Sequence, residues 1–266
     1  MSAVDENVVG KDMVGKDIVD KNMAGKRVVI TGGGSGIGAD MALAFAEAGA
    51  EVTITGRRET ALQTVAGQHD NIRCAVVDVT DEAAMVALFE QLGSVDIVIA
   101  NAGAAESAPF AKTSFEQWQR MLNVNLSGVF LTLREGLKQL NDGGRLIAVA
   151  STAGLKGYAY VGAYCAAKHG VVGLVRSLAA ETATRNITVN ALCPGFTDTP
   201  LLAASIETIV TKTGQSAEQA STHFKSTNPT GRLITPSEVT ATALWLCDPH
   251  SGAINGQAIS ISGGEV

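Results

Sequence analysis

From Arg27 onward, short runs of hydrophobic and β-branched residues alternate with longer segments in which hydrophobic positions recur every three to four residues. The short runs are typical of strands that are buried on both faces, and the longer segments are typical of helices that cover a sheet. The pattern predicts strands at 28–31, 51–55, 73–77, 95–100, 145–150, 188–192 and 258–261. It predicts helices at 38–48, 82–92, 115–140, 163–185 and 237–247.

Helix-start signals support two of these boundaries. Ser114 with Gln117 has the spacing of a capping box, and Thr235 with Glu238 repeats it, with Pro236 at the first helical position. Crossovers between parallel strands are right-handed, which leaves few topologies for alternating strands and helices. We therefore predict an α/β fold: a single Rossmann-like domain with a doubly wound, seven-stranded parallel sheet and helices on both faces.

The first residues depart from this pattern. Four copies of a five-residue unit, VGKDM, VGKDI, VDKNM and AGKRV, occupy residues 9–28. A period of five matches neither a strand nor a helix face, so we predict a flexible N-terminal arm at 1–22 and a catalytic domain at 23–266. The alternative is an arm that packs on a partner subunit.

Composition narrows the class of protein. The chain has 266 residues, of which 46% are hydrophobic and 17% charged, which is normal for a globular domain. No apolar run approaches the roughly 20 residues of a membrane span, and a net charge of −6 with scattered basic residues disfavours nucleic acid. The four cysteines lack metal-like spacing, so we expect reduced thiols in a cytoplasmic protein and no metal site.

A glycine-rich run follows the first predicted strand and opens the first predicted helix. Such a run lets the backbone approach a pyrophosphate, whose charge the helix N-terminus favours; the alternative is a plain turn. Its placement favours dinucleotide binding, and it contains the predicted cofactor-binding residues Gly32, Gly34, Ser35, Gly36, Ile37 and Gly38.

The turn after the second strand bears on the choice of cofactor. Residues 55–58 contain no acidic residue to accept hydrogen bonds from a ribose 2′-hydroxyl. Arg57 and Arg58 lie there instead, and guanidinium groups suit a 2′-phosphate. We therefore favour NADP(H), with NAD(H) as a possible cofactor; the alternative interpretation is that both arginines are solvated loop charges.

Candidate catalytic chemistry lies further along the chain. Tyr164 and Lys168 are four residues apart on a predicted helix and thus share a face. A cation about 4 Å from a phenol favours the phenolate by about 4 kcal/mol at an effective dielectric of about 20, which suits general acid/base work. Taken alone, such a pair is usually a surface contact. Ser151, at the end of the fifth strand, and Asn125, on the preceding helix, add polar groups near the expected ligand edge.

Together these motifs resemble the short-chain dehydrogenase/reductase family. The resemblance covers about residues 24–264, and the ordered set with its spacings is specific where each motif alone is weak. The motifs that carry it are Thr31–Gly38, Asp78-Val79, Asn101-Ala102-Gly103, Asn125, Ser151, Tyr164-x-x-x-Lys168, Pro194-Gly195 and Thr199.

The resemblance implies a role for each position. Tyr164 is expected to exchange the proton with the carbonyl or alcohol oxygen, which Ser151 also binds. Lys168 is expected to lower the pKa of Tyr164 and to bind the nicotinamide ribose, and Asn125 to hold a proton-relaying water. Tyr164 and Lys168 thus belong to both the catalytic and the cofactor-binding sets. The remaining cofactor-binding positions are Asp78 and Val79 by the adenine, Asn101, Ala102 and Gly103 on the adenosine side, and Pro194, Gly195, Thr197 and Thr199, with Thr199 at the carboxamide.

These inferences predict an NAD(P)-dependent oxidoreductase that interconverts a ketone and a secondary alcohol. The alternatives are a 3-ketoacyl-thioester reductase and a non-catalytic cofactor-binding regulator. The family usually forms homotetramers or homodimers, and its members carry a substrate lid, here at about 200–230. The apolar lid residues are interpreted equally well as helix packing or as a substrate wall.

Two further positions bear on the substrate. Lys156 could meet an anionic substrate, although a solvated loop lysine is the simpler interpretation. Family members that oxidise 3-hydroxybutyrate typically carry His and Lys where this chain has Ala153 and Val161, which argues against a small hydroxy acid held in that manner.

Overall fold

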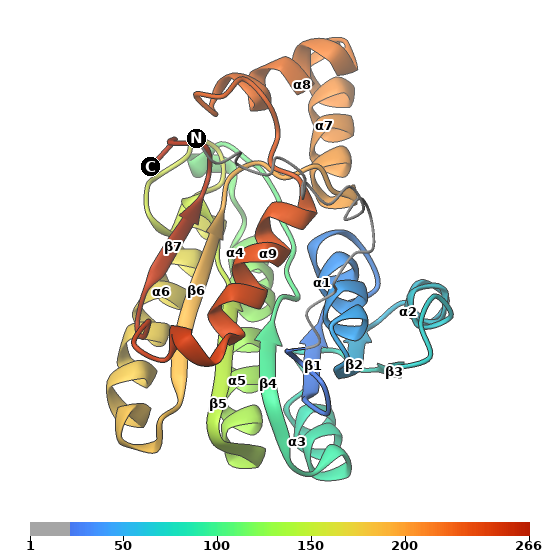
Figure 1. Cartoon of the computed structure of the whole chain (residues 1–266). Coiled ribbons are helices and arrows are strands. Elements are labelled where there is room, and N and C mark those ends of the chain that lie inside the picture. Colours follow the sequence, from blue (N-terminus) through green and yellow to red (C-terminus); the bar gives the residue numbers. More distant parts are fainter. Residues whose placement is uncertain (1–21) are drawn as a thin grey trace, which may run out of the picture.

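The computed structural model describes residues 22–266, which fold around a seven-stranded sheet (Figure 1). The strands are β1 (Arg27–Thr31), β2 (Glu51–Gly56), β3 (Ile72–Val76), β4 (Val95–Ala100), β5 (Leu140–Val149), β6 (Thr188–Pro194) and β7 (Ala258–Ile261). Neighbouring strands pair in parallel in the order β3-β2-β1-β4-β5-β6-β7. The predicted doubly wound parallel sheet is confirmed. Apart from Asn22, the predicted N-terminal arm lies outside the described residues.

The helices agree with the sequence pattern in most places. They are α1 (Gly36–Glu47), α2 (Glu59–Ala66), α3 (Glu82–Leu92), α4 (Phe115–Leu122), α5 (Gly128–Gln139), α6 (Gly162–Thr182), α7 (Pro200–Thr213), α8 (Ala217–Ser226) and α9 (Pro236–Cys247). The pattern did not predict α2, and it gave α7 and α8 only as a lid segment. No helix among residues 22–266 combines the length and apolar character that a membrane crossing requires.

Two hydrophobic layers sandwich the sheet because successive strand residues point to opposite faces. Val28 and Ile30 of β1 join the layer formed with α1 and α9, whereas Val29 between them joins the layer formed with α3, α5 and α6. Every residue of β6 is buried, as expected for a strand covered on both sides.

The predicted long helix at 115–140 is interrupted by a π turn. Residues 123–127 connect α4 to α5 with wider, π-helical hydrogen bonding, while the flanking residues keep helical dihedral angles. Such turns are frequent at functional sites. Asn125 lies in this turn and is fully buried.

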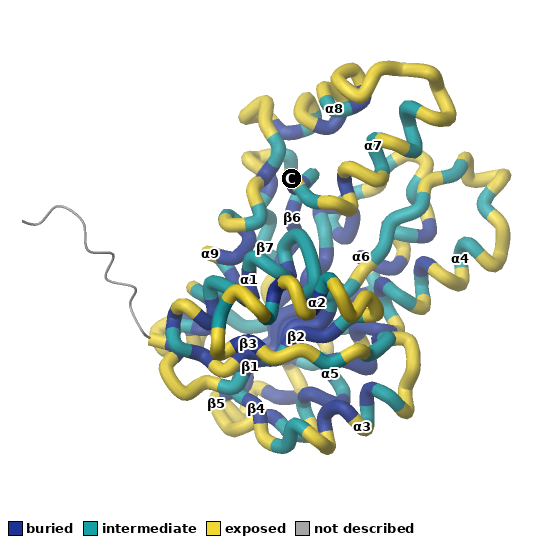
Figure 2. The backbone as a smooth tube through the Cα atoms, turned by 90° about the vertical axis from the view of Figure 1, so that its right-hand side faces the viewer, coloured by how far each residue is buried: buried dark blue, intermediate teal, exposed yellow. Residues whose placement is uncertain are grey.

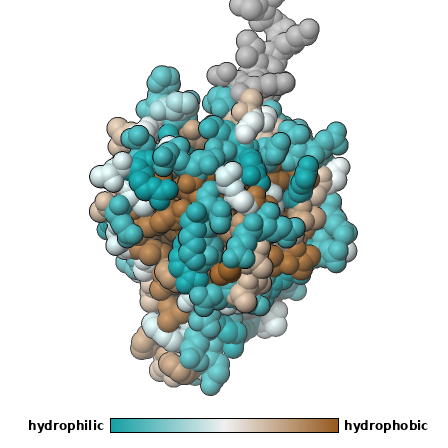
Figure 3. Space-filling model, turned by 90° about the horizontal axis from the view of Figure 1, so that it is seen from below, coloured by the Kyte–Doolittle hydropathy of each residue, from teal (hydrophilic) through white to brown (hydrophobic). Residues whose placement is uncertain are grey.

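The strand order reverses between β1 and β4, and in open α/β sheets ligands bind outside the carboxyl ends of the strands at this point. All the loops that carry predicted site residues leave this edge. Helices α7 and α8 project beyond it and are largely exposed (Figures 1 and 2). The opposite face, at the amino ends of the strands, shows hydrophobic residues between hydrophilic ones (Figure 3).

Candidate active site

The glycine-rich loop between β1 and α1 forms a tight cradle. Gly32 and Gly36 have φ angles of 69° and 56°, a region that side chains rarely adopt. A side chain at Gly38 would come within 2.4 Å of both the Asn101 side chain and the Gly32 carbonyl oxygen. Ser35 is the N-cap of α1 but makes no capping hydrogen bond, so the first N–H groups of this helix keep no side-chain partner. Uncapped N–H groups within a glycine cradle fit a pyrophosphate.

Both predicted arginines lie beside this cradle. Arg58 donates from Nη2 to the hydroxyl of Ser35 at 3.1 Å, and Arg57 pairs with the carboxylate of Asp78 at 3.9 Å. Burial raises the pKa of Asp78, but hydrogen bonds from Thr80 and the charge of Arg57 outweigh it and lower the pKa below its ordinary value. Two exposed cations at the end of β2 fit a phosphate group on an adenosine ribose.

The segment after β4 connects the glycine-rich loop to the predicted catalytic residues. Asn101 donates from its side chain to the carbonyl oxygens of Thr31 and Gly32 at 3.0 and 3.2 Å. A side chain at Gly103 would lie 3.0 Å from Oδ1 of Asn125 and 3.8 Å from Nζ of Lys168. Ala102 lies between these two positions, so the predicted run 101–103 reaches from the cradle to Asn125 and Lys168.

Val79 has a different environment from its neighbour Asp78. Its side chain is 6% exposed and belongs to the hydrophobic layer with α3, α5 and α6. A side chain at Gly128 would come within 2.7 Å of Val79 Cγ2. Val79 therefore contributes packing beneath the site, and any contact with a cofactor would come from its backbone.

The segment after β6 joins the cradle to the start of α7. Gly195 follows Pro194 and donates its N–H to the Ile261 carbonyl oxygen at 3.0 Å. Thr197 donates to the Gly195 carbonyl oxygen, and Thr199 donates to that of Thr197, at 3.0 and 3.2 Å. A side chain at Gly36 would lie 3.2 Å from Thr199 Cγ2, so Thr199 lies against the glycine-rich loop.

Four polar residues gather next to this segment. Tyr164 and Lys168 lie on the first turns of α6, and Ser151 follows β5. Ser151 accepts an N–H from Ala153 at 3.0 Å, and its own hydroxyl donates to the phenol oxygen of Tyr164, which acts to lower the pKa of that phenol. Lys168 donates from Nζ to the Val149 carbonyl oxygen at 2.8 Å and is 3% exposed.

Asn125 is held by its surroundings in the π turn. Its side-chain nitrogen donates to the carbonyl oxygens of Ala104 and Met121 at 2.9 and 3.0 Å. Its oxygen accepts the N–H of Ala104 at 3.1 Å. The buried amide is thus satisfied by the backbone, and it fixes the loop after β4 against the helix that packs on α6.

The electrostatics of this group differ from the sequence-based expectation. Burial raises the pKa of Tyr164, although the bond with Ser151 opposes the change. Burial also lowers the pKa of Lys168, to about 8. The ammonium group lies 5.6 Å from the Tyr164 ring centroid and donates to a backbone carbonyl, and burial is the largest influence on the pKa of the phenol. Tyr164 is therefore held neutral, in its proton-donating form.

Three segments near these residues are joined by hydrogen bonds. Residues 104–109 bond to the loop 152–161 through the Ala108 N–H and the Tyr160 carbonyl oxygen, at 2.8 Å. Lys212 of α7 donates to the Ser107 carbonyl oxygen at 3.4 Å. Tyr160 has a φ angle of 68°, a strained value for a non-glycine residue that often marks functional loops.

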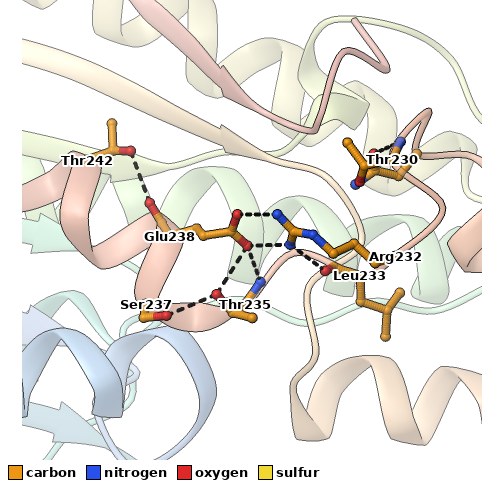
Figure 4. A network of polar contacts seen from close by, with 8 residues as sticks. Thr230, Arg232, Leu233, Thr235, Ser237, Glu238 and Thr242 are labelled. Carbon is orange, nitrogen blue, oxygen red and sulfur yellow. Dashed lines mark hydrogen bonds and ion pairs between the residues drawn. The ribbon is translucent and has the colours of Figure 1, made fainter.

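The lid segment leaves and rejoins the domain at the same place. Thr197 and Ile234 form a parallel bridge across its two ends. At the return, Arg232 donates two hydrogen bonds to the carboxylate of Glu238, which also accepts the Thr235 N–H (Figure 4). The bond from Thr235 confirms the predicted cap of α9.

Lys156 is not a solvated loop lysine. Its Nζ pairs at 3.0 Å with the buried carboxylate of Glu265, a residue that the sequence patterns did not reveal. The two apolar interpretations of the lid divide along α7. Leu202 is buried, as in helix packing. Ile206, Ile209 and Val210 are half-buried, on a helix that packs against α8 and is otherwise mostly exposed.

Comparisons with known proteins agree with this geometry. A family model described as enoyl-(acyl carrier protein) reductase matches residues 32–265. A D-beta-hydroxybutyrate dehydrogenase of Cupriavidus necator is 35% identical over 91% of this chain and 98% of its own length. An acetoacetyl-CoA reductase of an Acinetobacter species is 30% identical over 90% and 97%. A crystal structure of an actinorhodin polyketide ketoreductase variant with NADPH has a TM-score of 0.85 and 33% identity, over 91% and 97% of the two chains.

Proposed function

The chain belongs to the short-chain dehydrogenase/reductase family, and from this we propose that it is an NAD(P)-dependent oxidoreductase that interconverts a ketone and a secondary alcohol. The observation that carries the proposal is the grouping of Asn125, Ser151, Tyr164 and Lys168 beside the uncapped glycine cradle of α1. The bound cofactor supplies the hydride for this chemistry.

The side chains of the site suit the proton transfer. Tyr164, kept neutral by burial, donates its proton to the carbonyl oxygen during reduction. Ser151, whose hydroxyl proton points to the phenol oxygen of Tyr164 in this structure, would donate that proton to the same substrate oxygen and so orient it. Lys168 uses one N–H on Val149 and keeps two for a ribose and for charge balance as the phenol loses its proton. Asn125 fixes the loop beside them and is proposed to hold the relaying water.

The same residues would hold the cofactor. The cradle from Gly32 to Gly38 suits the pyrophosphate, Asp78 and the 101–103 segment suit the adenosine, and Thr199 suits the carboxamide. We favour NADP(H) over NAD(H) because Arg57 and Arg58 flank the cradle where a 2′-phosphate would lie. The similar polyketide ketoreductase was solved with NADPH, which supports this choice.

A second candidate function is reduction of a 3-ketoacyl thioester. The similarity to an acetoacetyl-CoA reductase and to a polyketide ketoreductase favours it. The chemistry at Tyr164 would be the same, and only the group beyond the ketone would differ. A non-catalytic regulator is disfavoured because all four catalytic positions are filled.

The finer properties of the protein remain proposals. We propose that residues 200–230 act as a lid, because α7 and α8 stand over the carboxyl edge with both ends pinned at Thr197 and Ile234. We propose a homotetramer or homodimer through α5 and α6, where a groove of about 220 Å³ is lined by Phe130, Leu133 and Leu174 among others, and Phe130 is 42% exposed. We also propose a cytoplasmic location, with which the exposed free thiol of Cys74 is consistent.

The test is a binding titration with NADPH and with NADH, followed by turnover of a panel of ketones and acetoacetyl-CoA with the tighter cofactor. We expect NADPH to bind more tightly and to be oxidised by at least one carbonyl compound. Tyr164→Phe should bind the cofactor almost unchanged and lose turnover by about 10²- to 10⁴-fold. Exposed Tyr160→Phe is the matched control. Turnover that survives in Tyr164→Phe would contradict the acid/base assignment, and failure to bind either cofactor would contradict the function.

A further inference from the structure

Glu265, which follows β7, places a buried carboxylate against the loop between Ser151 and Tyr164. Its side chain is only 2% exposed. The oxygen Oε1 accepts a hydrogen bond from the Tyr158 hydroxyl at 2.5 Å and lies 3.0 Å from Nζ of Lys156. The proton transfer proposed for Tyr164 and Ser151 does not use this buried carboxylate.

A chain of hydrogen bonds leads from Glu265 to the residue beside Ser151. The Tyr158 hydroxyl lies 2.7 Å from Oγ1 of Thr152. Because Tyr158 gives its only proton to Glu265, the Thr152 hydroxyl donates to Tyr158. Burial, and then the bond to the carboxylate, raise the pKa of Tyr158, which keeps it a neutral donor. Thr152 is 2% exposed and directly follows Ser151, so the carboxylate bears on the placement of Ser151.

The same tyrosine is linked to lid helix α8 through Phe196. Its ring packs edge-on against Phe196 with centroids 5.7 Å apart, and Phe196 packs against Phe224 of α8 at 4.7 Å. Asn228, at the lid's return, closely approaches Gly263, two residues before Glu265. Glu265 and Tyr158 therefore lie between the catalytic residues and the lid, in the wall of the proposed substrate space.

The charges in this wall bear on the substrate class. Lys156 is the cation of the 152–161 loop, and its pairing with Glu265 removes it as a partner for an anion. The second carboxylate oxygen, Oε2, is buried and has no hydrogen-bond partner among the described residues. A substrate carboxylate at this wall would therefore meet a lysine whose charge is already paired with Glu265, and no free cation of this loop to bind it.

We propose that Glu265 is a positioning and specificity-determining residue: through Tyr158 and Lys156 it fixes the loop 152–161, and it restricts substrates to ketones without a nearby carboxylate. The substrate class is then uncharged ketones and esters or thioesters of oxo acids, and free oxo acids are excluded. This inference rests on the proposed oxidoreductase function.

The experiment compares the full-length protein with the variants Glu265→Gln, Lys156→Met and the double variant, using NADPH with ethyl acetoacetate and with acetoacetate. Glu82→Gln on α3, which removes an exposed carboxylate paired with Arg134 of α5, is the matched control. We expect wild type to prefer the ester. Glu265→Gln should lower kcat for the ester and shift the ratio of kcat/KM values about tenfold toward the acid, because Lys156 becomes free. The shift should disappear in the double variant. An unchanged ratio in Glu265→Gln would overturn the specificity role.

Amide hydrogen exchange separates this proposal from the function on which it rests. Glu265→Gln should speed exchange in residues 152–161, whereas Glu82→Gln should not. Tyr158→Phe removes the bond to the carboxylate but keeps the ring, so it should loosen the same loop even if Glu265→Gln folds poorly. Unchanged exchange in Tyr158→Phe would overturn the positioning role. Wild-type protein that reduces neither compound nor any other ketone would instead contradict the proposed function.

Discussion

The cofactor half of the candidate site and its substrate half are built in different ways. Around β1 and β4 the course of the backbone shapes the site. Its glycines have neighbours that leave no room for a side chain, and the Asn101 side chain holds this backbone by donating to two carbonyl oxygens. On the substrate side, contacts between pairs of side chains, such as Lys156 and Glu265, hold the segments in place. Helices α7 and α8 on this side are mostly exposed. A backbone site tolerates little change, whereas a side-chain site can be re-specified one residue at a time.

The largest effect is expected where the backbone leaves least room. A side chain at Gly38 would lie 2.4 Å from Nδ2 of Asn101 and from the Gly32 carbonyl oxygen. Gly38→Ala should therefore weaken NADPH and NADH equally, by about 10- to 100-fold, which corresponds to about 1–3 kcal/mol. Fluorescence titration with both cofactors measures this. Gly173→Ala on α6, where no atom lies within 4 Å, is the control and should bind normally. Normal affinity in Gly38→Ala would remove the contrast between the two halves.

This contrast also explains what the sequence could predict. The cradle was predictable because only glycine suits its backbone angles and close contacts, which makes its spacing visible in a single sequence. The catalytic group was expected from the ordered family motifs that include Ser151, because Tyr164 and Lys168 four apart on a helix face would alone indicate only a surface pair. Both sets are short motifs at or next to the ends of regular elements.

The features that sequence reasoning missed depend on contacts between residues far apart in the chain, or on helices whose first turn carries no capping signal. Glu265 meets Tyr158 across 107 positions, and no local pattern encodes that pairing. Helix α2 begins after Arg58 without a side-chain cap, so nothing marks its start. Within the π turn, Asn125 bonds to Ala104 across 21 positions, a contact that no local pattern encodes. A signal for α8 did exist, since Ser216 and Gln219 form a capping box.

A smaller effect should distinguish NADPH from NADH within the cofactor half of the site. Arg58→Ala and Arg57→Ala should each weaken NADPH by about tenfold, because an exposed charge-assisted contact to a phosphate is lost. NADH lacks that phosphate, so its affinity should change by less than about twofold. Competition titrations at two salt concentrations check the assignment, since the NADPH effect should shrink as salt rises. An equal loss for both cofactors would refute the 2′-phosphate role.

The lid should show the opposite behaviour, a change in substrate use without a change in cofactor affinity. Ile206 is half-buried on α7, so Ile206→Ala should raise KM for apolar ketones by about fivefold, from about 1 kcal/mol of lost apolar contact. Steady-state kinetics and the NADPH dissociation constant are measured together. Glu207→Ala, exposed on the same helix, is the control. A lid variant that weakens NADPH as much as the ketone would show that the two halves are not separable.

The smallest effect concerns the exposed ion pair at the lid's return. The hydrogen bonds from Arg232 lower the pKa of Glu238 from 4.5 to about 2. A carboxyl whose pKa is lower in the folded state stabilises it above its unfolded pKa, and this stabilisation is lost as pH falls from about 4.5 towards 2. Because the pair is partly exposed, Glu238→Gln should cost less than about 1 kcal/mol at pH 7, and thermal unfolding should show the difference from wild type shrinking between pH 5 and pH 3. Glu47→Gln, an exposed carboxylate on α1, is the control. A deficit that stayed constant with pH would mean that Glu238 holds the lid by packing and that its charge is immaterial.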